Sequence, residues 1–288
     1  MKKLGLALAA LFLCCGLFAQ EITLEDIWVK GTFRSKSIAG IRSMNNGENY
    51  CILTSEGIEK YSYADGKKVE TIVSFAGLKF KGANEQVFEY EFNSDETKVL
   101  LATSPQFIYR RSYLANYYVY DMNTKQIISV CDEKVRLADF SPNGSMVAYV
   151  KDNNIYVLFL ADMSVRQLTT DGAFNKIIYG TTDWVYEEEF AITKGFFWSP
   201  DSKKIAFYSF DESKVKEFTI PYYGELYPMQ YTYKYPKAGE DNSVIGVHVY
   251  DMETSKTHNI DLGPEKDIYV PRLQWTLNNE VFLHKLNR

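Results

Sequence analysis

Residues 140–150 read Phe-Ser-Pro-Asn-Gly-Ser-Met-Val-Ala-Tyr-Val, which is an aromatic residue, a polar turn and an apolar run in succession. The pair Asn143-Gly144 is a strong turn signal, because both central residues of a type I′ hairpin turn need a positive φ. Asn46-Gly47 carries the same signal. The apolar run at 146–150 has the composition of a strand. The segment therefore predicts a β-hairpin with a type I′ turn.

The same order of residues recurs along the chain. The residues that open these turns are Ser43, Phe92, Phe140, Trp198 and Trp275. Their spacings of 49, 48, 58 and 77 residues lie near the ~40–50 residues of a propeller blade, with two insertions. A second hairpin follows at 118–125 and 247–256. We therefore predict an all-β fold, a β-propeller with four-stranded blades, of which about five are present. A non-repeating β-sandwich is the alternative, but it does not explain turns that recur in register.

Composition limits the classes of function. The chain has 288 residues, 46% of them hydrophobic and 24% charged, which is typical of a globular protein. Its formal charge of -5 provides no basic stripe for nucleic acid, so we predict no nucleic-acid partner. His248, His258 and His284 do not have the spacing of metal ligands. We predict no metal and no cofactor.

The first 19 residues have the pattern of a signal peptide. Lys2 and Lys3 precede an apolar run at 4–18, and Ala19 marks a cleavage point. An uncleaved anchor is the alternative, but the run is shorter than the ~20 residues that cross a bilayer. We therefore expect an exported protein, either periplasmic or secreted, and leave open an association with the cell surface. The mature chain would keep Cys51 and Cys131, and only the compartment argues for a disulfide between them.

The sequence pattern divides the mature chain into two parts. Residues 22–31 predict a short helix, with Thr23 as its N-cap and acidic residues in its first turn. We assign 20–40 to this helix and a linker, and 41–288 to the incomplete propeller domain.

The first insertion carries an acidic run at 183–190, Asp-Trp-Val-Tyr-Glu-Glu-Glu-Phe. Adjacent carboxylates repel one another, so such a run favours a cationic partner. A solvated acidic surface is the alternative. Insertions in repeat proteins often form the functional face, which favours binding. The second insertion is a tyrosine-rich arm that begins at Val215 and ends at Gly239. Its aromatic residues predict packing on its own blade, on another domain or on another subunit.

Three motifs together resemble the propeller domain of dipeptidyl peptidase IV, a serine exopeptidase family of the prolyl oligopeptidase clan. They are the acidic run at 183–190, Trp-Ser-Pro at 198–200 and Tyr-Pro-Lys-Ala-Gly at 235–239. The resemblance implies an eight-bladed propeller, and peptide substrates with a free N-terminus and penultimate Pro or Ala. It assigns Glu188 and Glu189 to the substrate's ammonium group, and it implies a homodimer through the 215–239 arm.

The resemblance also assigns Arg110, which opens the motif Arg-Arg-Ser-Tyr-Leu-Ala, to the substrate's first carbonyl group. Neighbouring residues on a helix point about 100° apart, so Glu188 and Glu189 can share one ligand only near a helix end or bend. Glu187 would then face solvent as a bystander. Within a strand Arg110 and Arg111 would point to opposite faces, and only the resemblance selects Arg110.

The sequence contains no Gly-x-Ser-x-Gly nucleophile elbow. We therefore expect no serine, aspartate and histidine triad in these 288 residues, and no peptidase activity from them alone. The favoured function is the substrate-gating part of an exported dipeptidyl peptidase whose α/β-hydrolase domain would lie in a longer protein. The alternatives are a propeller that only binds or scaffolds, and a tripeptidyl peptidase of the same clan.

Overall fold

The computed structural model describes residues 21–35, 40–82 and 85–288, and it divides into two compact units, Met1–Gly40 and Ile41–Arg288. In the first unit, helix α2 (Leu24–Trp28) begins at the N-cap Thr23, which forms a reciprocal capping box with Asp26. The helix is shorter than the predicted range of 22–31, and the chain after it turns at Gly31 with a φ of 60°. The predicted signal peptide lies outside the described residues. Within the described part of the chain, no helix is both long and apolar enough to cross a membrane.

The described part of the larger unit consists of successive antiparallel sheets. The first sheet contains β1 (Arg42–Ser43), β2 (Asn49–Leu53), β3 (Gly57–Ser62) and β4 (Lys68–Ser74). The second contains β5 (Val87–Phe92), β6 (Lys98–Phe107), β7 (Tyr113–Asp121) and β8 (Ile127–Ser129). The third contains β9 (Arg136–Phe140), β10 (Met146–Lys151), β11 (Asn154–Phe159) and β12 (Val165–Gln167). In each, strands adjacent in sequence are adjacent in the sheet, which is the meander of a propeller blade.

The fourth sheet carries both insertions. It contains β13 (Ile177–Thr181), β14 (Lys194–Trp198), β15 (Lys204–Asp211), β18 (Val244–Asp251) and β19 (Lys256–Asn259). Helix α3 (Trp184–Phe190) lies between β13 and β14, and the hairpin of β16 (Glu217–Tyr222) and β17 (Met229–Lys234) lies between β15 and β18. A last pair, β20 (Ile268–Trp275) and β21 (Val281–Asn287), follows. The described residues thus form four blades, the inserted β16–β17 hairpin and the β20–β21 pair, in agreement with the predicted β-propeller.

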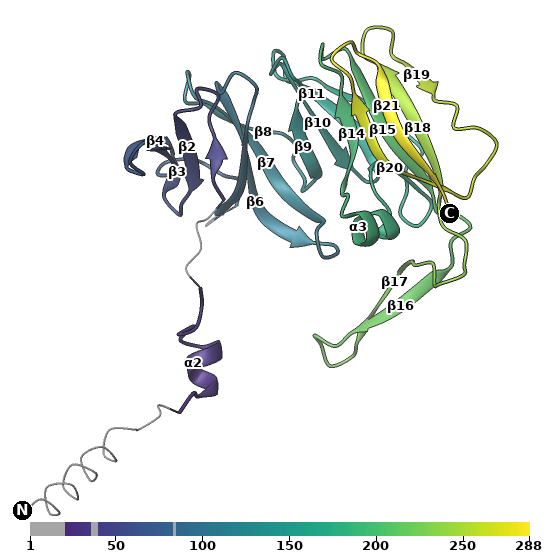
Figure 1. Cartoon of the computed structure of the whole chain (residues 1–288), viewed down its shortest axis with the longest axis horizontal. Coiled ribbons are helices and arrows are strands. Elements are labelled where there is room, and N and C mark those ends of the chain that lie inside the picture. Colours follow the sequence, from purple (N-terminus) through teal and green to yellow (C-terminus); the bar gives the residue numbers. More distant parts are fainter. Residues whose placement is uncertain (1–20, 36–39, 83–84) are drawn as a thin grey trace, which may run out of the picture. The chain divides into compact units, whose positions relative to one another are not determined.

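Neighbouring blades pack face to face in chain order (Figure 1). Strand β10 shows the pattern: Val147 and Tyr149 join the apolar cluster shared with the second sheet, whereas Met146, Ala148 and Val150 join the cluster shared with the fourth. Because side chains alternate along a strand, a blade between two others is apolar on both faces. The fold therefore has a separate hydrophobic core between each two neighbouring blades.

The recurring turn has one backbone geometry in all five places. The residue four positions after each opening residue has a positive φ, and its N–H donates to the carbonyl group three residues earlier. These residues are Gly47, Glu96, Gly144, Ser202 and Asn279. The turns therefore recur in register, as predicted.

The predicted type I′ turn is wrong, because the asparagine before each turn glycine does not have a positive φ. Asn46 instead accepts hydrogen bonds from the N–H groups of Glu48 and Asn49 through its side chain. These bonds hold the asparagine inside the turn and leave the positive φ to Gly47, as in a type I turn followed by a bulge.

Candidate functional site

Helix α3 is fixed at both ends by its own sequence. The side chain of Asp183 caps its N-terminus by accepting from the N–H of Tyr186 at 2.9 Å, and it also accepts from the hydroxyl of Ser243 at 2.7 Å. Burial raises the pKa of Asp183, and these two hydrogen bonds oppose the rise. Ala191 closes the C-terminus in the left-handed conformation, with a φ of 56°. The acidic run therefore forms a short helix whose ends are defined.

The three glutamates are consecutive residues of this helix and differ in exposure. Glu187 is fully buried, the side chain of Glu188 is 18% exposed, and Glu189 is exposed. The last turn contains no basic residue. Because the C-terminus of a helix carries partial negative charge, carboxylates there are stabilised by a cation from elsewhere.

The prediction that Glu187 faces solvent is wrong. One carboxylate oxygen, Oε1, accepts from the backbone N–H groups of Arg111 and Ser112, each at 2.8 Å. These donors belong to the loop between β6 and β7, whose tip lies beside α3 (Figure 1). No sequence pattern indicates this contact, because the partners are backbone groups more than 70 positions earlier in the chain.

The same loop brings Arg110 to the helix. The expectation that Arg110 and Arg111 lie in a strand is wrong, because they form a bend that the hydrogen bond from Ile108 N–H to the Ser112 carbonyl closes at 2.9 Å. Arg110 Nε lies 3.7 Å from Glu188 Oε2, and the arginine side chain is 72% exposed. The structure thus brings two of the three candidate residues together, with Glu189 next in sequence on the same helix turn.

A cavity of about 530 Å³ lies beside the helix. Its polar lining includes Tyr109, Arg136, Asp183, Glu212, Tyr231 and Lys234. Burial and the nearby charge of Asp183 raise the pKa of Glu212 to about 8, and Lys234 opposes that shift. The cavity therefore holds a carboxyl group that is largely protonated at neutral pH.

The tyrosine-rich arm is attached to this site at its base. Tyr235 packs against Trp184 of α3 with ring centroids 4.4 Å apart, and Tyr233 packs against Tyr109 at 5.8 Å. The far end is different, because Leu226 is 91% exposed. Figure 1 shows the β16–β17 hairpin extending away from its sheet. Of the predicted arrangements, the structure shows the base packed on the propeller and the tip uncovered.

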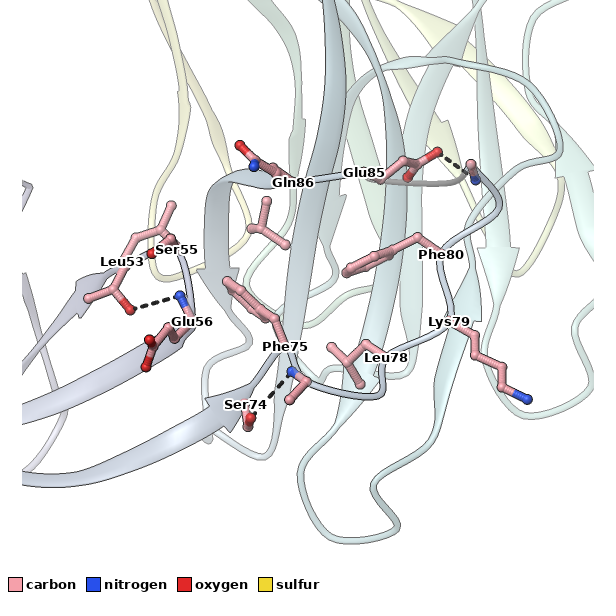
Figure 2. Close-up of a pocket in the computed structure, with 14 residues that line it drawn as sticks. Leu53, Ser55, Glu56, Ser74, Phe75, Leu78, Lys79, Phe80, Glu85 and Gln86 are labelled. Atoms are coloured by element: carbon pink, nitrogen blue, oxygen red, sulfur yellow. Dashed lines mark hydrogen bonds between the residues drawn. The ribbon is translucent and has the colours of Figure 1, made fainter.

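A second, open cleft of about 1040 Å³ lies between the first two sheets. Figure 2 shows Phe75, Leu78 and Phe80 pointing toward one another within it. Burial works against the charged form of its Glu85, but hydrogen bonds from Thr103, Tyr118, Asn116 and the Gly82 N–H together lower its pKa. This carboxylate is already occupied by protein donors, so the ammonium site is better assigned to α3.

The sequence does not predict one group of three hydrogen-bonded side chains. His248 shares hydrogen bonds with Ser209 and Asn259, both at 2.8 Å. Ser209 lies inside β15, paired with Gly246 of β18. Backbone N–H groups there bond to the neighbouring strand and cannot stabilise an oxyanion, so we assign this trio no catalytic role. Burial lowers the pKa of His248.

Cys51 and Cys131 are both free thiols. Among the described residues, no three His, Cys, Asp or Glu side chains are placed to hold a metal ion.

Comparison with known proteins identifies the family. The family model described as "Dipeptidyl peptidase IV (DPP IV) N-terminal region" matches residues 93–288. The chain belongs to the dipeptidyl peptidase IV family. Its similarity to a crystal structure of Porphyromonas gingivalis dipeptidyl peptidase 4 has a TM-score of 0.86 at 40% identity, over 93% of this chain and 39% of that one. The resemblance drawn from the three motifs is thereby confirmed.

Other relatives of this dipeptidyl peptidase IV family chain are more distant. A probable dipeptidyl-aminopeptidase B from Coccidioides posadasii is 32% identical over 67% of the chain and 23% of its own length. Human prolyl endopeptidase FAP is 31% identical over 93% of the chain and 36% of its own length. A putative dipeptidyl aminopeptidase IV from Bacteroides ovatus, with a TM-score of 0.64 at 20% identity, supports the fold alone. The chain therefore spans well under half the length of these relatives.

Proposed function

We propose that this chain is the substrate-gating propeller part of an exported serine dipeptidyl peptidase. The observation that carries the proposal is the approach of Arg110 to Glu188 at the end of α3, with Glu189 beside them. Glu188 and Glu189 bind the free ammonium group of a peptide, and Arg110 donates to the carbonyl group that follows it. The sequence similarity to dipeptidyl peptidases supports these roles.

The chemistry fits a primary ammonium group. Such a group has three N–H donors, and hydrogen bonds to a charged carboxylate contribute roughly 1.5 to 3 kcal/mol each. Two glutamates at a helix C-terminus supply the acceptors and gain a cation that the helix itself lacks. A blocked amino terminus removes that charge, so internal peptide segments and acetylated peptides are excluded.

The same geometry would set the length of the product. If the glutamates stand at a fixed distance from a nucleophile, cleavage falls after the second residue, which in this family is Pro or, less often, Ala. The serine, aspartate and histidine of that reaction belong to the α/β-hydrolase domain of the longer peptidase. The proposal includes export to the periplasm or exterior through residues 1–19 and a homodimer formed through the 215–239 arm.

The experiment that tests this function is product analysis with the full-length gene product. Peptides of the form X-Pro-Y are incubated with the purified protein, and the products are identified by mass spectrometry. Release of dipeptides supports the proposal. Release of tripeptides would indicate the tripeptidyl peptidase, and binding without turnover would indicate a scaffold.

A further inference from the structure

One buried carboxylate of α3 has no part in the proposed contacts with substrate. Glu187 is fully buried, and its Oε2 atom has no hydrogen-bond partner among the described residues. Burying an ionised carboxylate is costly unless a counter-charge and hydrogen bonds offset the loss of water. Glu187 therefore needs both a reason to be retained and a source of compensation.

The hydrogen bonds come from the loop that carries Arg110. The two N–H groups that Glu187 binds are those of Arg111 and Ser112, directly after Arg110 in the chain. Arg110 itself is 72% exposed, and the ion pair that it makes with Glu188 is 3.7 Å long. An exposed pair of that length contributes little order of its own. The backbone anchor at the next two residues is thus the stronger restraint on the arginine.

A partly buried positive charge lies on the neighbouring blade. Arg136 begins β9, lines the cavity beside α3, and has an Nη2 atom that is buried without a partner among the described residues. Burial lowers the pKa of Arg136, whereas the charge of Glu187 acts to raise it. Loop, helix and β9 belong to three successive blades.

We propose that Glu187 is a positioning residue that fixes the Arg110 loop against α3 through its two backbone hydrogen bonds. The inference rests on the proposed function, because it explains how the arginine and the two substrate carboxylates share one geometry. It assigns Glu187 an indirect role, exerted through Arg110 and not through contact with the peptide. Loss of the carboxylate should therefore matter only while Arg110 is present.

The test is a double-mutant cycle in the full-length peptidase with an X-Pro chromogenic substrate. The variants are Glu187→Ala, Arg110→Ala, their double variant and Glu187→Gln, which keeps an acceptor for both N–H groups. Glu85→Ala is the control, because Glu85 accepts several hydrogen bonds from the base of the same β6–β7 hairpin. We expect each single alanine variant to raise KM about tenfold and the double variant to raise it about tenfold in total. Glu187→Gln should stay within threefold of wild type.

A second readout follows the loop directly. Hydrogen exchange should show faster exchange of the Arg111 and Ser112 amides in Glu187→Ala and near wild-type protection in Glu187→Gln. If the two alanine effects on KM multiply to about a hundredfold, or if Glu85→Ala raises KM equally at equal loss of Tm, the positioning role is wrong. Equal turnover of free and acetylated peptides by the wild-type enzyme would instead contradict the proposed function, whatever the variants do.

Discussion

Replacement of Glu189 by alanine separates a binding role from a structural one. Glu189 is exposed at the end of α3. Exposed substitutions away from caps and cores usually change stability by no more than ~0.5 kcal/mol. We therefore expect Glu189→Ala to leave the folded enzyme almost as stable as wild type.

The loss of substrate binding should be much larger. A charge-assisted hydrogen bond contributes roughly 1.5 to 3 kcal/mol, and each 1.36 kcal/mol changes the rate about tenfold. A peptide that covers Glu189 would exclude water from the bond, which places the effect near the upper end. We expect kcat/KM to fall about a hundredfold, mainly through a higher KM.

The assay measures kcat/KM on an X-Pro chromogenic substrate and Tm on the same preparations. Glu253→Ala is a matched control, because Glu253 is also exposed and pairs with a lysine, Lys203, at 2.7 Å on another part of the blade. A change in kcat/KM of less than threefold for Glu189→Ala, or a fall in Tm that accounts for it, would refute the binding role.

Three further predictions concern the same region. The pKa of Glu212 is raised from 4.5 to about 8 in the folded protein, so the wild-type protein loses stability as pH rises from about 4.5 to 8. Glu212→Gln lacks this loss, so its free energy of unfolding in urea should rise relative to wild type across that window, by up to about 1.4 kcal/mol per pH unit. A difference between the two proteins that does not change with pH would contradict this. Leu226→Asp with Tyr227→Asp, at the exposed arm tip, should give monomers by light scattering with the site intact, and a persistent dimer would argue against the arm interface. Asp183→Ala should cost about 1 kcal/mol of stability through loss of the cap, with Asp183→Asn milder, and equal Tm values for the two variants would contradict the capping role.

The fold could be predicted because its signal is local. Each blade repeats an opening residue, a polar turn and an apolar strand, and the positive φ falls four positions after Ser43, Phe92, Phe140, Trp198 and Trp275. The turn type was missed at the asparagines because side-chain hydrogen bonds to the backbone compete with the type I′ geometry. The predicted helix at 22–31 has the correct position, but the helix in the structure is shorter, Leu24–Trp28.

The site could be predicted only in part. The acidic run and Arg110 were found by motif, but the pairing of Arg110 with Glu188 joins segments far apart in the sequence. The motif predicts that Glu187 faces solvent because its partners are backbone N–H groups, which no side-chain pattern reports. Arg136 was overlooked for a similar reason, since nothing in its neighbourhood in the sequence indicates that it is buried near Glu187.

Discrimination between free and acetylated amino termini tests the central claim most directly. The measurement compares kcat/KM of the full-length enzyme for one X-Pro peptide and its N-acetylated form. Removing one partner of a buried charge pair costs on the order of 2 to 5 kcal/mol. We predict that the free peptide is preferred by at least about thirtyfold, and that Glu188→Gln with Glu189→Gln removes most of this preference. Equal turnover of the two peptides by the wild-type enzyme would contradict the account.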